Sequence, residues 1–268
     1  MFYHAHNGSV YAGNSQMYYI SFGNGNKNLI IVPGLGDGLH TVKGMAIIFS
    51  IIYRIMSKEF TVYVFSRKNN LQDGYSTIEM AKDLAEALAV LKIFKADVLG
   101  ISQGGMIAQY LAIDYPDLVN KLILVSTSSN PNETIKKTVG AWIEMAIQEN
   151  YKDLIIDTAE KSYSERTLKK YRLIYPLIGI IGKPKSFKRF IIQASSCIAH
   201  NSYAQLNKIV CPVLVIGGDS DKIIGTTESY LIAEKISHSE LFLYNGLGHA
   251  VYEEAKDFNY RCLNFLMK

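Results

Sequence analysis

The chain has 268 residues, of which 49% are hydrophobic and 19% are charged, so it can bury a large core and is not expected to be disordered. This length fits one large domain, or a core domain that carries an insertion. The net charge of +4 is too small to indicate a nucleic-acid-binding protein.

Neither membrane insertion nor export is indicated by the sequence. The longest apolar stretch, residues 46–56, is shorter than the roughly 20 residues that a membrane-spanning helix needs. The first ten residues lack the basic segment and apolar core of a secretory signal, so we expect a cytoplasmic protein. Cys197, Cys211 and Cys262 are far apart and lack the spacing of a metal site, so we expect buried thiols, no metal and no cofactor.

Short runs rich in β-branched residues alternate with longer helical patterns along most of the chain. This alternation predicts an α/β fold with a mostly parallel sheet and helices on both faces. Eight strands are expected, at residues 10–11, 17–22, 29–32, 60–65, 97–99, 122–125, 213–216 and 241–244. Helices are expected between them at residues 45–56, 76–91 and 106–114, and at residues 251–267. Ser76 and Glu79 have the spacing of a capping box at the start of one of these helices.

The alternation is interrupted once, by more than eighty residues between the strands at 122–125 and 213–216. Helices are expected there at residues 135–148, 151–160, 164–171 and 186–198, because prolines and glycines break the pattern between them. We interpret residues 129–204 as a helical cap (lid). It would cover the carboxyl edge of a core domain formed by residues 1–128 and 205–268, since ligands bind at that edge in open α/β sheets.

Part of this insertion is strongly basic. Residues 161–189 contain nine lysines or arginines and one acid, which gives the segment a net charge of +8. One interpretation is that these bases concentrate anionic substrates near the entrance of a pocket that the apolar run at 173–181 helps to line. The other interpretation is a solvated basic face without a role in binding.

A serine flanked by glycines directly follows the predicted strand at 97–99. The segment Gly100-Ile101-Ser102-Gln103-Gly104-Gly105 has the pattern GxSxG and precedes the helical run at 106–114. Such glycines permit a sharp strand-to-helix turn that presents the serine hydroxyl at the edge of the sheet. The pattern alone also fits a tight turn without chemistry.

Two later strands are each followed by a loop with an ionisable residue. The strand at 213–216 precedes Gly217-Gly218-Asp219-Ser220-Asp221, and the strand at 241–244 precedes Asn245-Gly246-Leu247-Gly248-His249. Together with the serine turn, Gly218-x-x-Asp221 and Gly248-His249 followed by two glutamates resemble the α/β-hydrolase superfamily. The resemblance is to its capped esterase, lactonase and haloperoxidase-like members, and it spans nearly the whole chain outside the insertion.

The resemblance implies a catalytic triad with Ser102 as nucleophile, His249 as general base and Asp221 as the acid that orients the histidine. Asp219 is the alternative acid, but its spacing from Gly218 differs from the family loop, and we expect it to cap the turn. An oxyanion hole formed by the backbone N–H groups of Leu35 and Gln103 is also implied. The loop at residues 33–38 begins Pro-Gly, where many members of the family have His-Gly.

The expected function is hydrolysis of a small carboxylic ester, lactone or thioester by a serine hydrolase. Two alternatives remain open. One is carbon–carbon bond hydrolysis or cofactor-free perhydrolysis at the same triad, and the other is a non-catalytic ligand receptor with this fold. The expected partner is a small molecule in each case, and the sequence defines no oligomeric state. Trp142, Tyr163 and Tyr175 of the insertion could line the pocket, although aromatic residues on such helices more often only pack.

Overall fold

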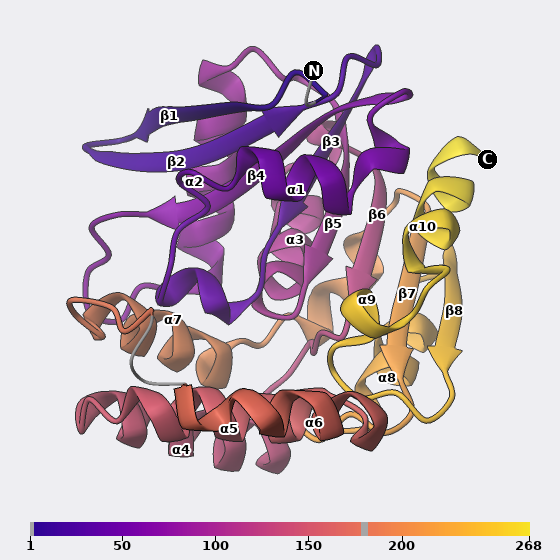
Figure 1. Cartoon of the computed structure of the whole chain (residues 1–268). Coiled ribbons are helices and arrows are strands. Elements are labelled where there is room, and N and C mark those ends of the chain that lie inside the picture. Colours follow the sequence, from indigo (N-terminus) through magenta and orange to yellow (C-terminus); the bar gives the residue numbers. More distant parts are fainter. Residues whose placement is uncertain (1–2, 178–181) are drawn as a thin grey trace.

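The computed structural model of the chain describes residues 3–177 and 182–268. Its strands form one eight-stranded sheet in the order β1-β2-β4-β3-β5-β6-β7-β8 (Figure 1). The strands are β1 (His6–Ala12), β2 (Ser15–Phe22), β3 (Lys27–Val32), β4 (Phe60–Lys68), β5 (Ala96–Ile101), β6 (Val119–Val125), β7 (Val213–Gly218) and β8 (Ser239–Tyr244). A strand lies at each predicted position, so the predicted α/β fold is confirmed.

The sheet is antiparallel at one edge and parallel elsewhere. β1 pairs antiparallel with β2, and β2 pairs antiparallel with β4. From β4 to β8 all neighbouring strands are parallel, so their carboxyl ends meet at one edge of the sheet. This edge faces the lower helices in Figure 1.

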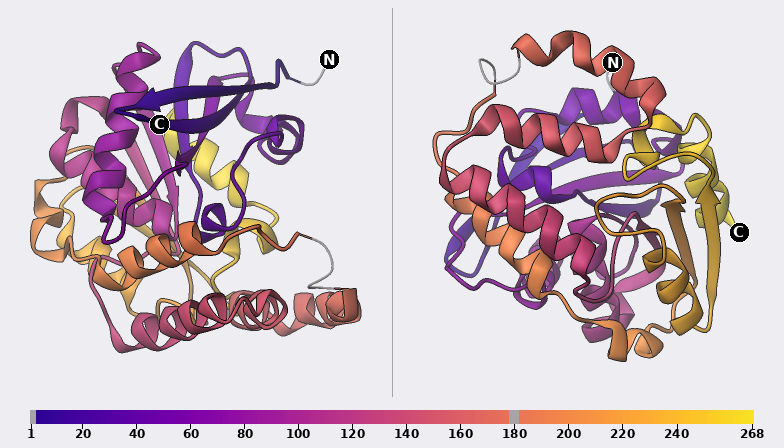
Figure 2. Two further views of the ribbon diagram at one scale, coloured as in Figure 1. Left: turned by 90° about the vertical axis from the view of Figure 1, so that its left-hand side faces the viewer. Right: turned by 90° about the horizontal axis from the view of Figure 1, so that it is seen from below.

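Helices cover both faces of the sheet (Figure 2). The α-helices are α1 (Ala46–Ile52), α2 (Thr77–Val90), α3 (Gln103–Asp114), α4 (Glu133–Ile147), α5 (Tyr151–Ser162), α6 (Glu165–Tyr171), α7 (Lys188–Ala199), α8 (Glu228–Lys235), α9 (Val251–Glu254) and α10 (Phe258–Met267). The short 3-10 helices are η1 (Leu35–Gly38), η2 (Arg54–Met56), η3 (Pro116–Leu118), η4 (Arg172–Leu177) and η5 (Tyr203–Lys208). The capping box of Ser76 and Glu79 is present at the start of α2.

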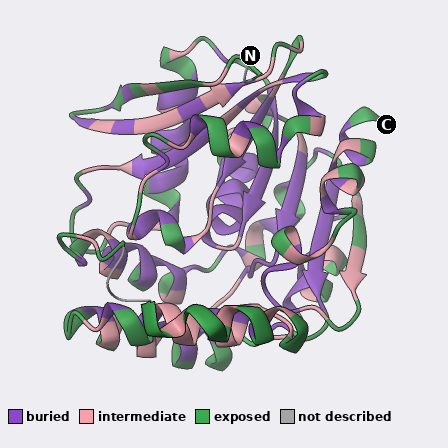
Figure 3. Cartoon of the chain, viewed as in Figure 1, coloured by how far each residue is buried: buried purple, intermediate pink, exposed green. Residues whose placement is uncertain are grey.

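The core consists of two apolar layers separated by the sheet. Successive side chains of a strand point to opposite faces, so Ile30 and Val98 pack in the layer with α2, α3 and α8. Leu29 and Leu99 pack in the layer with α1 and α10. Figure 3 shows that the central strands are buried along most of their length. The free thiols of Cys197, Cys211 and Cys262 are buried, as predicted.

Two of the predicted helices are wrong in their extent. The helix expected at 45–56 ends at Ile52, because the backbone of Tyr53 leaves helical geometry and η2 follows. The helix expected at 251–267 is divided into α9 and α10 by the extended backbone of Ala255. Neither break contains glycine or proline, so the sequence carries no local signal for them.

Helices α4 to α7 form the long insertion between β6 and β7, and they lie beyond the carboxyl ends of the strands (Figure 1). A third apolar cluster joins the insertion to the loops of the sheet. It includes Trp142 of α4, Phe190 of α7 and Leu35 of η1. Within the described residues, no helix has the length and apolarity needed to cross a membrane.

Candidate active site

Ser102 lies at the turn between β5 and α3, where the glycine pattern predicts a sharp bend. Its backbone has φ 54° and ψ −120°, a conformation that costs a residue with a side chain about 1–3 kcal/mol. Gly104 makes the bend possible, since a Cβ at this position would lie 1.9 Å from the backbone oxygen of Val32. A Cβ at Gly100 would lie 2.6 Å from the backbone oxygen of Gly104. Close backbone packing therefore holds Ser102 at the carboxyl edge of the sheet.

The side chains of Ser102, His249 and Asp221 form one hydrogen-bonded chain. His249 Nε2 lies 2.9 Å from Ser102 Oγ, and His249 Nδ1 lies 2.7 Å from Asp221 Oδ2. An ionised carboxylate only accepts hydrogen bonds, so Nδ1 donates to Asp221 and Nε2 accepts from the Ser102 hydroxyl. Asp221 and His249 are both buried. The arrangement can move a proton from the serine to the histidine.

The two aspartates of the loop after β7 have different partners. Asp221 Oδ1 accepts the backbone N–H groups of Ile223 and Ile224 at 2.8 and 3.1 Å, which leaves Oδ2 for His249. Asp219 Oδ1 accepts the backbone N–H of Gly246 at 2.8 Å. Asp219 thus links the loop after β7 to the loop after β8, and it is Asp221 that meets the histidine.

Two backbone N–H groups beside Ser102 are available to a ligand. Leu35 and Gln103 are the first residues of η1 and α3, where N–H groups have no intrahelical acceptor. Among the backbone hydrogen bonds of the described residues, neither N–H group donates to a backbone oxygen. The loop before η1 lies against the serine, since a Cβ at Gly34 would be 3.2 Å from Ser102 Cβ.

A cavity of about 770 Å³ lies above these groups, and both Ser102 and His249 line it. Trp142, a predicted pocket residue, contributes to its wall and donates from Nε1 to Asp157 at 2.7 Å. Tyr163 and Tyr175 are absent from the described lining: Tyr163 donates to Glu253, and Tyr175 donates to Glu160. Residues 178–181 of the apolar run expected at the pocket lie outside the described residues.

Comparison with known proteins assigns the chain to a family. Residues 27–256 match the family model of the alpha/beta hydrolase fold. The chain belongs to the α/β-hydrolase family. This α/β-hydrolase is 23% identical over 278 residues to a 2-hydroxy-6-oxononadienedioate/2-hydroxy-6-oxononatrienedioate hydrolase of a Pseudomonas species, and the match covers 98% of the chain and 93% of the relative.

Solved structures share the fold over nearly the whole α/β-hydrolase chain. MGS-M2, an alpha/beta hydrolase enzyme from a Medee basin deep-sea metagenome library, superimposes with a TM-score of 0.85 at 20% identity and covers 97% of this chain and 98% of its own. The enol-lactonase of Burkholderia xenovorans LB400 superimposes with a TM-score of 0.83 at 17% identity and covers 97% of this chain and 100% of its own. The family resemblance and the fold predicted from sequence are thereby confirmed, and this fold is that of hydrolase enzymes.

A buried ionic cluster of the α/β-hydrolase lies behind the η1 loop. The side chain of Asp37 accepts a hydrogen bond from Arg189 of α7 at 2.5 Å and from the backbone N–H of Arg67 at 3.1 Å. Burial alone would raise the pKa of Asp37, but Arg189 and Arg67 outweigh that effect and lower it below the ordinary value of 3.8. The sequence carries no local signal for this cluster, because its members lie on three separate segments.

Arg67 also connects the cluster to Gln103, the residue after Ser102. Its guanidinium donates to the side-chain oxygen of Gln103 at 2.9 Å and to the backbone oxygen of Pro33 at 2.5 Å. The side-chain amide of Gln103 in turn donates to the backbone oxygen of Gln193 in α7 at 2.8 Å. The two expected oxyanion-hole segments are therefore tied to each other and to the insertion.

Two glutamates follow His249 on α9 and have different surroundings. Glu254 accepts the backbone N–H of Ser164 at 2.9 Å, so it binds the amino end of α6. Glu253 accepts a hydrogen bond from the Tyr163 hydroxyl, and its side chain lines the cavity. Burial, and to a smaller degree the charge of Glu254, raise the pKa of Glu253 above its ordinary value, although the bond from Tyr163 opposes this.

Two further histidines, His40 and His200, differ in position. His40 lines the cavity. His200 lies in a buried polar cluster, where its Nδ1 is 2.9 Å from the hydroxyl of Thr77. Burial lowers the pKa of His200 to about 3, so this side chain is neutral and has a structural place.

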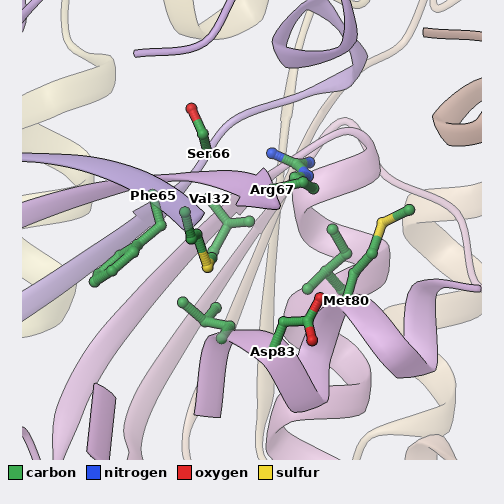
Figure 4. A pocket seen from close by; sticks show the side chains of 9 residues that line it. Val32, Phe65, Ser66, Arg67, Met80 and Asp83 are labelled. Atoms are coloured by element: carbon green, nitrogen blue, oxygen red, sulfur yellow. The ribbon is translucent and has the colours of Figure 1, made fainter. Parts of the chain in front are cut away.

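A second cavity of the α/β-hydrolase, between β4 and α2, is too small for a substrate (Figure 4). Its volume of about 10 Å³ corresponds to about one water molecule. Arg67 of β4 and Asp83 of α2 are among its lining residues. In the part of the chain that the structure describes, no group of three or more histidine, cysteine or acidic side chains could hold a metal ion.

Proposed function

We propose that this α/β-hydrolase is a serine hydrolase that cleaves a small carboxylic ester, lactone or thioester through an acyl-enzyme. The observation that carries the proposal is the hydrogen-bonded chain of Ser102, His249 and Asp221 at the base of the 770 Å³ cavity. A serine hydroxyl is a weak nucleophile until a base removes its proton, and this chain supplies the base and the group that orients it.

The reaction proceeds in two acyl transfers. Ser102 Oγ attacks the carbonyl carbon of the substrate while its proton passes to His249 Nε2, and the carbonyl oxygen becomes an oxyanion. The N–H groups of Leu35 and Gln103 donate to that oxyanion. His249 then gives the proton to the departing alcohol or thiol, which leaves Ser102 acylated. A water molecule repeats the sequence, with His249 as its base, and releases the acid.

Asp221 keeps the imidazole of His249 in one tautomer and stabilises the imidazolium that forms when the histidine takes the proton. The support for this role is that both oxygens of Asp221 are engaged, Oδ1 by backbone N–H groups and Oδ2 by His249. The carboxylate is therefore fixed relative to the backbone and cannot turn away from the histidine.

We also propose that residues 129–204 act as a cap over the core formed by residues 1–128 and 205–268. Trp142, Thr158 and Ser162 of the insertion line the cavity together with the triad. The insertion thus contributes to the wall that separates the acyl group from bulk water.

The chemistry of the dioate hydrolase relative is a less suitable model. Its substrate carries two carboxylates, and a buried carboxylate requires a cationic partner. No lysine or arginine is among the described residues that line the cavity. This favours an ester, lactone or thioester over a diacid substrate.

The proposal is tested with p-nitrophenyl esters of graded acyl length, lactones and acyl thioesters, together with labelling by a fluorophosphonate. We expect turnover of at least one of these classes and covalent attachment of the fluorophosphonate to Ser102, identified by peptide mass spectrometry. Ser102→Ala is the matched control and should show neither. If wild type neither turns over any substrate nor reacts with the fluorophosphonate, the proposal is contradicted and the alternative of a non-catalytic ligand receptor is favoured.

A further inference from the structure

Acidic side chains outnumber lysines and arginines among the described residues that line the cavity above the triad. Of the described residues that line it, two carry carboxylates, Asp37 and Glu253, and none is a lysine or an arginine. Asp37 is neutralised by its ion pair with Arg189. The carboxylate of Glu253 instead forms its hydrogen bond with the neutral hydroxyl of Tyr163. Glu253 therefore provides the uncompensated charge of the cavity wall.

Two cations behind the η1 loop, Arg189 and Arg67, are engaged by protein groups. Arg189 donates to the backbone oxygens of Lys68 and Arg67 and to Asp37. Arg67 donates to Pro33 and Gln103, behind the loop that holds the expected oxyanion hole. Neither guanidinium is in a position to pair with a negative group of a substrate inside the cavity.

Glu253 is accessible where a substrate would lie. Its side chain is exposed, yet surrounding protein desolvates it enough to raise its pKa, which fits a position inside a concave site. Its charge also contributes to the raised pKa of Tyr53 and Tyr252, for which burial is the larger cause. Both tyrosines line the cavity together with Glu253.

The aromatic lining of the cavity also favours a positively charged ligand. Phe49, Tyr53, Trp142 and Tyr252 all contribute to the wall. The face of an aromatic ring attracts a cation within about 6 Å, and quaternary ammonium groups are bound by combinations of such rings. An anion gains nothing from these faces and is repelled by Glu253.

We propose that Glu253 determines the substrate charge of this site, so that an ester bearing an ammonium group is preferred to its neutral isostere and an anionic ester is disfavoured. The inference rests on the proposed ester hydrolysis and narrows its substrate class. A carboxylate at about 4–6 Å from an ammonium, in a partly desolvated site, would supply about a tenfold preference together with the aromatic faces.

The test compares the choline ester and the 3,3-dimethylbutyl ester of one acid, which differ by a quaternary nitrogen in place of a carbon. We expect wild type to give a ratio of kcat/KM of about ten in favour of the choline ester. Glu253→Gln keeps the hydrogen-bond acceptor for Tyr163 but removes the charge, so the ratio should fall towards one. Because a ratio is taken within one preparation, partial unfolding of a variant does not change it.

Glu59→Gln is the matched control, since this exposed glutamate lies just before β4 at the opposite edge of the sheet. It should keep the wild-type ratio. A hemisuccinate ester of similar length should be hydrolysed more slowly than the neutral ester by wild type, and this difference should narrow in Glu253→Gln. A wild-type ratio of one or less, or an unchanged ratio in Glu253→Gln, overturns the inference.

Binding separates the inference from the proposed reaction. Ser102→Ala cannot form an acyl-enzyme, so the affinities of choline and 3,3-dimethylbutan-1-ol for it can be measured by NMR titration. Tighter binding of choline, lost when Glu253→Gln is added, supports the inference even if no ester is hydrolysed. Hydrolysis without a preference for choline in either measurement supports the proposed function and contradicts the role of Glu253.

Discussion

The strained backbone of Ser102 positions the serine hydroxyl, but this backbone conformation does not require the hydroxyl. Its φ of 54° is imposed by the close packing of Gly100 and Gly104, so alanine can occupy the same turn. We expect Ser102→Ala to lower kcat by at least about 10³-fold, because the nucleophile is lost. The midpoint of thermal unfolding should stay within a few degrees of wild type. Retention of more than about a tenth of the wild-type turnover would contradict the assignment.

The two neighbouring aspartates offer an internal comparison of the acid position. Asp221→Asn leaves an amide against His249 Nδ1, which favours the tautomer in which Nε2 carries the hydrogen and cannot accept from Ser102. We expect kcat to fall by about 10³ to 10⁴-fold. Asp219→Asn keeps an oxygen for the N–H of Gly246 and should lower kcat by less than about tenfold. Steady-state measurement of kcat for the two variants tests this order. A larger loss of kcat in Asp219→Asn than in Asp221→Asn would make Asp219 the acid that orients His249.

At the scale of elements, α7 is attached to the η1 loop by a buried ion pair. Asp37 is almost fully buried, and Arg189 approaches it from the insertion while also donating to two backbone oxygens at the end of β4. Removal of one partner from a buried pair leaves the other charge without compensation, which costs about 3–5 kcal/mol. The same contacts hold the loop that supplies the N–H of Leu35. Loss of the Asp37–Arg189 pair should therefore lower both the free energy of unfolding and kcat.

Arg189→Met tests this connection. We expect a loss of about 3 kcal/mol in the free energy of unfolding by urea, and a fall of tenfold or more in kcat because the loop of the proposed oxyanion hole is less firmly held. Lys188→Met, at the preceding residue of α7, removes an exposed lysine whose ammonium lies 3.6 Å from Asp73. Because exposed ion pairs contribute about 0–1 kcal/mol, this control should change little. If the two variants lose the same free energy of unfolding and the same kcat, the buried pair does not hold the loop as we expect.

The sign of the pH dependence follows from the lowered pKa of Asp37. A carboxyl group that is more acidic in the folded than in the unfolded protein stabilises the fold at pH values above its unfolded pKa, near 3.8. That contribution is lost as the pH falls from about 3.8 towards the folded pKa. Arg189→Met removes the main cation responsible, so its free energy of unfolding should decline less than that of wild type over the same acid range.

For the molecule as a whole, local patterns predict the sheet and the position of the triad. Runs rich in β-branched residues, most of them followed by glycine-rich turns, locate the eight strands, because both the strand preference and the turn are properties of short segments. Loops at the carboxyl ends of parallel strands are brought together by the topology, so Ser102, Asp221 and His249 could be predicted to meet. Their bond distances follow only from the folded chain.

Features that depend on packing between distant segments could not be predicted in this way. The pair of Asp37 and Arg189 joins residues 152 positions apart, and nothing in either local sequence indicates the other. The sequence places Glu253 just after the histidine loop, but its place in the cavity wall depends on how α9 lies against α5 and α6. The break at Ala255 likewise results from packing, since the apolar residues of α10 continue the helical spacing of α9.

The ion pairs of the basic segment at residues 161–189 help to choose between its two interpretations. Five of its nine bases form ion pairs with acids outside or inside the segment, and these are Lys161, Arg172, Lys183, Lys188 and Arg189. Much of the net charge of +8 is therefore neutralised locally. The interpretation as a paired and solvated surface is favoured over steering of anionic substrates.

Salt dependence distinguishes these two interpretations. Raising the ionic strength from about 0.01 to 0.15 M shortens the Debye length from roughly 30 to 8 Å, which screens long-range attraction but not contacts inside the cavity. If the bases do not steer anions, kcat/KM for an anionic ester should not fall relative to that for a neutral ester of similar size. A fall of several-fold confined to the anionic ester would show that the basic surface attracts substrates. That result would leave the roles of Ser102 and His249 untouched, because it concerns encounter and not the chemical step.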